Sequence, residues 1–134
     1  MDVHNNTVIG AHRAVWLGDS YANDGGLSVR DNLIVMSDQL GTGESDPLMA
    51  FAKPYTDNPD PSVLDFSQNC YHAPNADAGF RFGTGSAGSF VAWQGDGLDV
   101  SSVWGDPMFD TSSGEDYRVG SGSPCESLPG VGAW

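Results

Sequence analysis

Basic side chains are scarce in this sequence, so the few that stand beside other polar residues are the first candidates for chemistry. The chain has five Lys and Arg residues against eighteen Asp and Glu residues. Arg30 lies in the stretch VRDNLIV, two residues before an Asn, and His4 and Ser67 each stand two residues before an Asn as well. If these stretches stack, His4, Arg30 and Ser67 form a row on one face. Such a row could bind a substrate, and Arg30 is the candidate catalytic residue within it.

The three Asn residues share a local pattern: an apolar residue, two polar ones, Asn, and then a mostly β-favouring trio. They are Asn6, Asn32 and Asn69, so their spacings are 26 and 37 residues. Repeats of 20–50 residues indicate solenoids and similar arrays, whose parallel coils place equivalent residues about 4.8 Å apart. Each Asn could then bond to the Asn above and below it, and we expect such a structural ladder. The alternative, that each is an ordinary turn residue, remains open.

Short strand patterns separated by Gly- and Asp-rich turns run through most of the chain, and no stretch has sustained helical spacing. The patterns cover residues 7–9, 14–17, 27–29, 33–36, 63–66, 70–72, 79–82 and 90–93. Leu48–Ala52 could form one helical turn or a loop anchor. The sequence therefore predicts an all-β fold, and the Asn repeat favours a right-handed parallel β-helix, a single-stranded solenoid of few coils. Residues 1–89 are expected to form the coils, with a long loop insertion at about 41–60.

The composition excludes several classes of partner. A formal net charge of −13 argues against nucleic acid, whose phosphates need Lys and Arg, and against adhesion to anionic membranes. No run approaches the roughly 18 apolar residues of a membrane-spanning helix, and the chain opens without a signal-peptide pattern. Because the repeat begins at Val3 with no lead-in, we expect the sequence to be the C-terminal part of a longer protein.

The pattern changes at Phe90, where strand signals give way to large aromatic residues and prolines. Proline lacks the N–H needed to continue a ladder, and a solenoid's last coil exposes an apolar interior that must be covered. Residues 90–134 are therefore expected to form an irregular C-terminal capping segment. Cys70 and Cys125 match no metal or redox spacing, which leaves a disulfide and two independent buried thiols as alternatives.

Several short motifs in the second half of the chain form a set. They are Asn69-x-Tyr71, Trp93-Gln94, Asp99-x-x-Ser102, Asp106-Pro107-x-Phe109, Asp116-Tyr117-Arg118-Val119, Ser123-Pro124 and Gly130. This set resembles the C-terminal coils and cap of the right-handed parallel β-helix superfamily, the pectate-lyase-like solenoids of bacterial secreted proteins. The resemblance covers essentially the whole chain. The family commonly has Ala after Ser-Pro, where this chain has Cys125.

The resemblance implies a secreted or cell-surface protein that acts on or binds polysaccharide along one parallel sheet. Lyases of this type use an Arg or Lys base and often Ca²⁺, and hydrolases use paired carboxylates. A carboxylate pair is not supported, because Asp31 and Asp65 stand at different offsets from the ladder. The strings at 57–60 and 75–77 could offer oxygen ligands to Ca²⁺, although neither has a known loop spacing.

Two functions remain open at this stage. In the first, catalytic coils of a polysaccharide lyase or glycoside hydrolase lie upstream, and this part alone is inactive. In the second, the chain is a noncatalytic, adhesin-like or structural surface solenoid. The residue types fit both, because an Arg on a strand can also be an ordinary solvated residue. A third possibility is a small stand-alone protein, whose first coil would expose a free strand edge at residues 3–9 through which it could self-associate.

Overall fold

Short parallel β-strands make up most of the protein in the computed structural model, which describes residues 1–17, 26–37, 48–53, 61–74, 78–109 and 117–131. They form three sheets. The first has the order β1-β4-β7, with β1 Asp2–His4, β4 Leu27–Arg30 and β7 Leu64–Ser67. The second has the order β10-β8-β5-β2, with β2 Thr7–Ala11, β5 Leu33–Met36, β8 Cys70–His72 and β10 Val103–Trp104. The third has the order β3-β6-β9, with β3 Arg13–Trp16, β6 Met49–Lys53 and β9 Gly79–Phe82.

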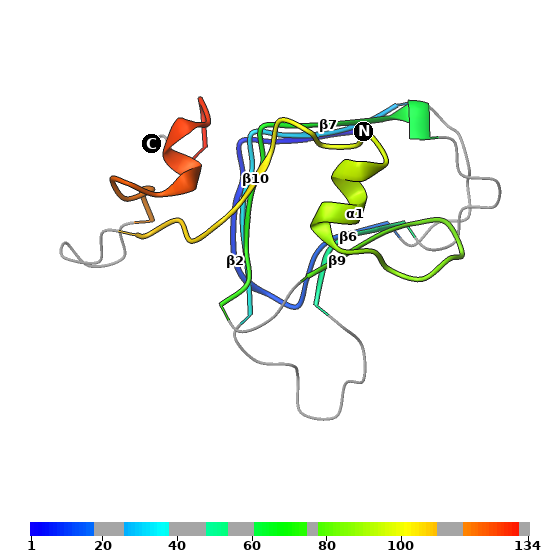
Figure 1. Cartoon of the computed structure of the whole chain (residues 1–134), viewed down its shortest axis with the longest axis horizontal. Coiled ribbons are helices and arrows are strands. Elements are labelled where there is room, and N and C mark those ends of the chain that lie inside the picture. The colour runs from blue at the N-terminus through cyan, green and yellow to red at the C-terminus, as the bar shows by residue number, and fades with distance from the viewer. Residues whose placement is uncertain (18–25, 38–47, 54–60, 75–77, 110–116, 132–134) are drawn as a thin grey trace.

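The chain visits the three sheets in rotation for three turns, each of which adds one strand to each sheet, and β10 then adds a fourth strand to the second sheet. All paired strands named above are parallel. In Figure 1 the strands of one sheet overlap in projection, with the first sheet along the top, the second on the left and the third below. This architecture confirms the all-β prediction and fits a parallel β-solenoid.

Two of the predicted local structures were wrong. Residues 90–93 form the start of a helix, α1 (Phe90–Gly95), and not a strand. The Ser89 side chain caps it by accepting a hydrogen bond from the Ala92 N–H at 3.2 Å. The segment Leu48–Ala52, expected as a helical turn or loop anchor, contributes most of strand β6. Strand β6 therefore lies within the predicted loop insertion at 41–60, whose remaining residues are mostly outside the described part.

Inward-facing side chains from all three sheets form the main core. Alternation along the strands sends Ile34, Phe51, Phe66 and Phe80 inward, and each is at most 7% exposed. Helix α1 lies within the outline of the coils at one end of the solenoid (Figure 1). Its Trp93 ring lies 5.4–5.8 Å, between centroids, from the Phe51, Phe66 and Phe80 rings. The helix therefore closes that end of the core with aromatic contacts to three strands.

The last described segment lies outside the coils, against the outer face of the second sheet (Figure 1). Its short 3₁₀-helix η3 (Pro124–Ser127) carries Cys125, which forms a disulfide with Cys70 of β8. Leu33 and Val35 of β5 pack with Cys70, Cys125 and Val131 in a second apolar cluster. The residues expected as one cap thus serve two places, with α1 at the end of the core and η3 on the side of the second sheet.

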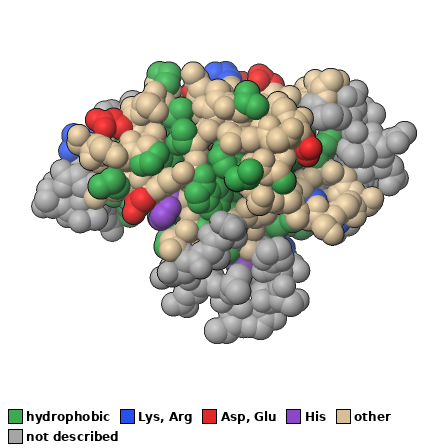
Figure 2. Space-filling view, viewed as in Figure 1, with side chains coloured by type: hydrophobic (Ala, Val, Ile, Leu, Met, Phe, Trp, Pro, Cys, Tyr) green, Lys and Arg blue, Asp and Glu red, His purple; other side chains and the backbone are tan. Residues whose placement is uncertain are grey.

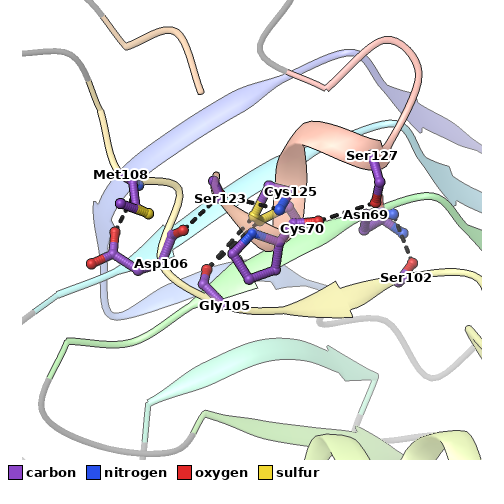
Figure 3. Close-up of a disulfide and its surroundings, with 10 residues drawn as sticks. Asn69, Cys70, Ser102, Gly105, Asp106, Met108, Ser123, Cys125 and Ser127 are labelled. Carbon is purple, nitrogen blue, oxygen red and sulfur yellow. Dashed lines mark hydrogen bonds between the residues drawn. A yellow bond between two sulfur atoms is a disulfide. The ribbon is translucent and has the colours of Figure 1, made fainter. Parts of the chain in front are cut away.

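Side-chain and backbone hydrogen bonds fix the segment around this disulfide (Figure 3). The Ser123 hydroxyl donates to the Asp106 carbonyl at 2.7 Å and accepts from the Cys125 N–H at 3.1 Å. The Gly105 carbonyl oxygen lies 3.6 Å from the Cys125 sulfur. The sequence left a disulfide and two independent buried thiols as alternatives, and the structure contains the disulfide.

Candidate functional site

The outer face of the first sheet carries two rows of polar side chains. Pairing in register places His4 beside Arg30 and Arg30 beside Ser67. A second row joins Asp2, Ser28 and Asp65 in the same way. Period-2 alternation turns the residues between them, including the buried Val29 and Phe66, toward the core. We call the outward set the polar face; it consists of Asp2, His4, Ser28, Arg30, Asp65 and Ser67.

Arg30 is at the centre of the polar face. Its guanidinium lies 3.3 Å from an Asp2 carboxylate oxygen through Nη2 and 3.3 Å from an Asp31 oxygen through Nη1. The His4 Nε2 atom lies 3.8 Å from the same Asp2 oxygen. The Arg30 side chain is still 40% exposed and that of Asp2 is 48% exposed. These groups are oriented by one another and remain open to a ligand.

The second row of the polar face, which contains Asp2, Ser28 and Asp65, adds a hydroxyl and a further carboxylate. The Ser28 hydroxyl donates to an Asp65 carboxylate oxygen at 3.5 Å. In Figure 2, acidic and basic side chains lie next to each other along the upper edge, where Figure 1 places this sheet. The structure thus brings the predicted residues His4, Arg30 and Ser67 into one row, and their role in binding or catalysis stays a prediction.

The Asn side chains lie at the corner between the first and second sheets. The Asn6 Nδ2 atom donates to Asn32 Oδ1 at 3.0 Å, and Asn32 Nδ2 donates to Asn69 Oδ1 at 3.0 Å. The backbone N–H groups of Asn6 and Asn32 donate to the same two oxygens at 3.0 and 3.1 Å. Asn32 and Asn69 are at most 1% exposed. Because each Asn stands two residues after a residue of the polar face, the ladder fixes the spacing of that row.

A buried polar cluster ends the ladder at the fourth coil. Ser102 takes the place of an Asn there, and its hydroxyl accepts from the Asn69 N–H at 2.7 Å. The Ser102 hydroxyl also donates to the Asp99 carboxylate, and the Tyr71 hydroxyl donates to Asp99 Oδ2 at 2.7 Å. Asp99 is 3% exposed and Ser102 is 5% exposed. The cluster is thus closed to a ligand and completes hydrogen bonds that a fourth Asn would otherwise make.

Burial controls the protonation of this cluster. It raises the pKa of the Asp99 carboxyl above its usual value, and hydrogen bonds from Ser102, Tyr71 and Asn69 oppose part of that rise. Burial also raises the pKa of Tyr71 well above its usual value, with a further contribution from the nearby Asp99 charge. The sequence interpretation missed the joint role of these residues. The signal available in the sequence was the Asp99-x-x-Ser102 motif, which comes one coil after the Asn69-x-Tyr71 motif.

A metal site can be assessed only among the described residues. No group of three or more His, Cys, Asp or Glu in that part could hold a metal ion. The strings at 57–60 and 75–77, which could offer oxygen ligands to Ca²⁺, lie outside the described residues. Within the same described ranges, no helix has both the length and the apolar character needed to cross a membrane.

Similarity to other proteins adds no information to this geometry. No protein-family model, curated protein or solved structure matches the chain. The function must therefore be inferred from the polar face and from the parts of the fold that hold it in place.

Proposed function

We propose that this chain is a polysaccharide-binding β-solenoid module and that the polar face is its binding surface. The observation that carries this proposal is the alignment of two polar rows across three adjacent parallel strands. Adjacent strands lie about 4.8 Å apart, which is close to the length of one pyranose ring. A glycan lying across the strands would present a new sugar at each coil, where polar side chains at equivalent positions can hydrogen-bond it.

The finer fold belongs to the same proposal. Connections between parallel strands of one sheet are right-handed in about 98% of cases, which supports a right-handed coil. The tail motifs that include Asp99, Ser102, Asp106 and Pro107 support membership of the pectate-lyase-like superfamily. One solenoid fold hosts many activities, so this membership would define the scaffold and leave the chemistry to the polar face.

A secreted or cell-surface location is also part of the proposal. The Cys70–Cys125 disulfide joins residues 55 positions apart and holds the tail against the second sheet. Disulfides of this structural kind persist in oxidising compartments and are rare where thiols are kept reduced. Extracellular polysaccharides are present in those same oxidising surroundings.

Binding is favoured over cleavage by the contacts of Arg30. Its guanidinium holds the carboxylates of Asp2 and Asp31, so both of these groups are engaged in one ion-pair network. Glycoside hydrolysis needs two carboxylates on either side of the scissile bond, one to protonate the leaving oxygen and one to attack or activate water. Two carboxylates on one guanidinium suit ligand positioning better, which favours the noncatalytic, adhesin-like alternative.

The test compares two arginines on different sheets. Arg30→Met removes the central donor of the polar face, and Arg81→Met makes the same chemical change on β9, where Arg81 donates to the Gly83 and Thr84 carbonyls. Affinity electrophoresis in gels containing soluble polysaccharides measures binding. Because hydrogen bonds to charged groups contribute about 1.5–3 kcal/mol, we expect Arg30→Met to weaken binding about tenfold or more. Equal binding by wild type and Arg30→Met, with both variants folded, would refute the assignment.

A further inference from the structure

The charges of the polar face and its rim are unequal. Their side chains include three carboxylates, those of Asp2, Asp31 and Asp65, and one guanidinium, that of Arg30, which contacts the first two. Counting side chains alone, three negative charges and one positive charge give a net charge of −2 when His4 is neutral. The chain as a whole carries a formal charge of −13. The local and the long-range fields therefore both oppose the approach of an anionic polymer.

The Arg30 guanidinium, the one guanidinium on the polar face, already binds two carboxylates of the protein. Its Nη1 and Nη2 atoms each lie 3.3 Å from a carboxylate oxygen of the protein. A carboxylate-bearing sugar would have to displace Asp2 or Asp31 from Arg30, and the displaced carboxylate would stay close to the incoming one. This exchange gives no net charge pairing and adds repulsion between like charges.

Uncharged hydroxyl groups fit the same surface without that cost. A sugar hydroxyl both donates and accepts, so it can donate to a carboxylate and accept from Arg30, His4 or a serine. Among the described residues, Oδ1 of Asp2 and Oδ1 of Asp65 accept no side-chain hydrogen bond. These two acceptors belong to one row, two coils apart, with the Ser28 hydroxyl between them. Three successive sugars could each meet one member of this row.

The geometry points to a neutral polysaccharide, in contrast to a uronan, as the ligand of the polar face, with the glycan chain running across β1, β4 and β7. This inference rests on the proposed polysaccharide binding and specifies its substrate class. The strands of this sheet turn no Phe, Tyr or Trp side chain outward. Recognition would therefore come from hydrogen bonds and not from ring stacking, which makes the affinity per sugar modest and nearly insensitive to salt.

The experiment measures binding of the full chain to three kinds of polymer by affinity electrophoresis. The neutral probes are soluble β-glucan, xylan and galactan, the anionic probe is polygalacturonate, and the cationic probe is soluble chitosan. Each is used at about 20 mM and about 200 mM NaCl, a range over which the Debye length falls about threefold. We expect at least one neutral polymer to bind, with less than a twofold change with salt, and polygalacturonate to bind at least tenfold more weakly.

A double variant, Asp2→Asn with Asp65→Asn, tests the charge argument directly. It removes two negative charges and keeps the size of both exposed side chains, so the fold should be retained, as far-UV circular dichroism can verify. We expect it to bind polygalacturonate more tightly than the wild type at low salt and to lose at least threefold in affinity for the neutral polymer. No change in either affinity would overturn the inference.

The two levels of the argument fail in different ways. Tight, salt-sensitive binding of polygalacturonate or chitosan with no binding of neutral polymers would overturn the neutral substrate class and leave polysaccharide binding in place. Failure of the folded wild type to bind every polymer would overturn both the proposed function and this inference.

Discussion

Replacing Asn32 by Ala should destabilise the protein more than any other single change in the ladder, because Asn32 is its central member. The Asn32 side chain takes part in five hydrogen bonds. Its Oδ1 accepts from the backbone and side-chain nitrogens of Asn6, and its Nδ2 donates to the Val3 and Arg30 carbonyls and to Asn69 Oδ1. Asn32 itself is 1% exposed, so water cannot replace these partners.

The expected loss follows from this set of bonds. Each intramolecular hydrogen bond contributes about 0.5–1.5 kcal/mol net, and a buried group left without a partner costs about 1–3 kcal/mol. Because the Nδ2 group has two hydrogens, its three contacts count as about two full hydrogen bonds. Together with the two bonds that Oδ1 accepts, the substitution removes about four full bonds. Asn32→Ala should therefore lower the free energy of unfolding by about 3–5 kcal/mol. For a chain of this size that corresponds to a fall in Tm of about 10–20 °C.

The control is Asn6→Ala at the exposed end of the ladder. The Asn6 side chain makes two hydrogen bonds, to the His4 carbonyl at 2.9 Å and to Asn32 Oδ1 at 3.0 Å, and it is accessible to water. Its loss should cost only about 1 kcal/mol. Urea denaturation followed by circular dichroism measures both variants. If Asn32→Ala and Asn6→Ala lose the same stability within error, the ladder is not the stabilising element described here.

Two further predictions concern the tail and the end of the ladder. Replacing Cys70 and Cys125 by Ala should cost about 4 kcal/mol in urea denaturation, because the bridge closes a 55-residue separation; a loss below about 1 kcal/mol would contradict this. Burial raises the Asp99 pKa above 3.8, so between that pH and the raised value the folded state holds a proton that the unfolded chain has released. Stability should therefore fall as pH rises through this interval. Asp99→Asn should flatten that part of a stability–pH profile, and an unchanged slope would contradict the assignment.

The register of the first sheet was predictable from sequence because one residue type marks it. Asn6, Asn32 and Asn69 repeat with their flanking residues, and stacking them also aligns His4 with Arg30. A buried amide must hydrogen-bond a partner of matching geometry, so it has to occupy the same position in each successive coil. Where such a polar marker recurs, a sequence specifies which residues lie beside one another across coils.

The misassigned segments lack a marker of this kind. In β6, Ala50 and Ala52 are as buried as Phe51, so the strand shows no alternation of apolar and polar residues. In α1, Phe90 and Trp93 are the buried residues, and a spacing of three within a four-residue apolar run also fits a strand. Packing on both faces of β6 and insertion of Trp93 into the core decided these structures, and neither is visible in a local pattern.

The location of the polar face also follows from how the rest of the surface is used. The tail and its disulfide cover the outer face of the second sheet, where Leu33 and Cys70 are fully buried. On the third sheet, the outward row contains Ala52, which is 0% exposed, between Arg81 and Trp16, whose ring lies 4.5 Å from the Arg13 guanidinium carbon. The first sheet is thus the one whose outer face presents aligned polar side chains to solvent over three described strands. A ligand that reads the coil repeat has its regular array of hydrogen-bonding groups there, which is why the decisive experiments are directed at Arg30 and its carboxylate neighbours.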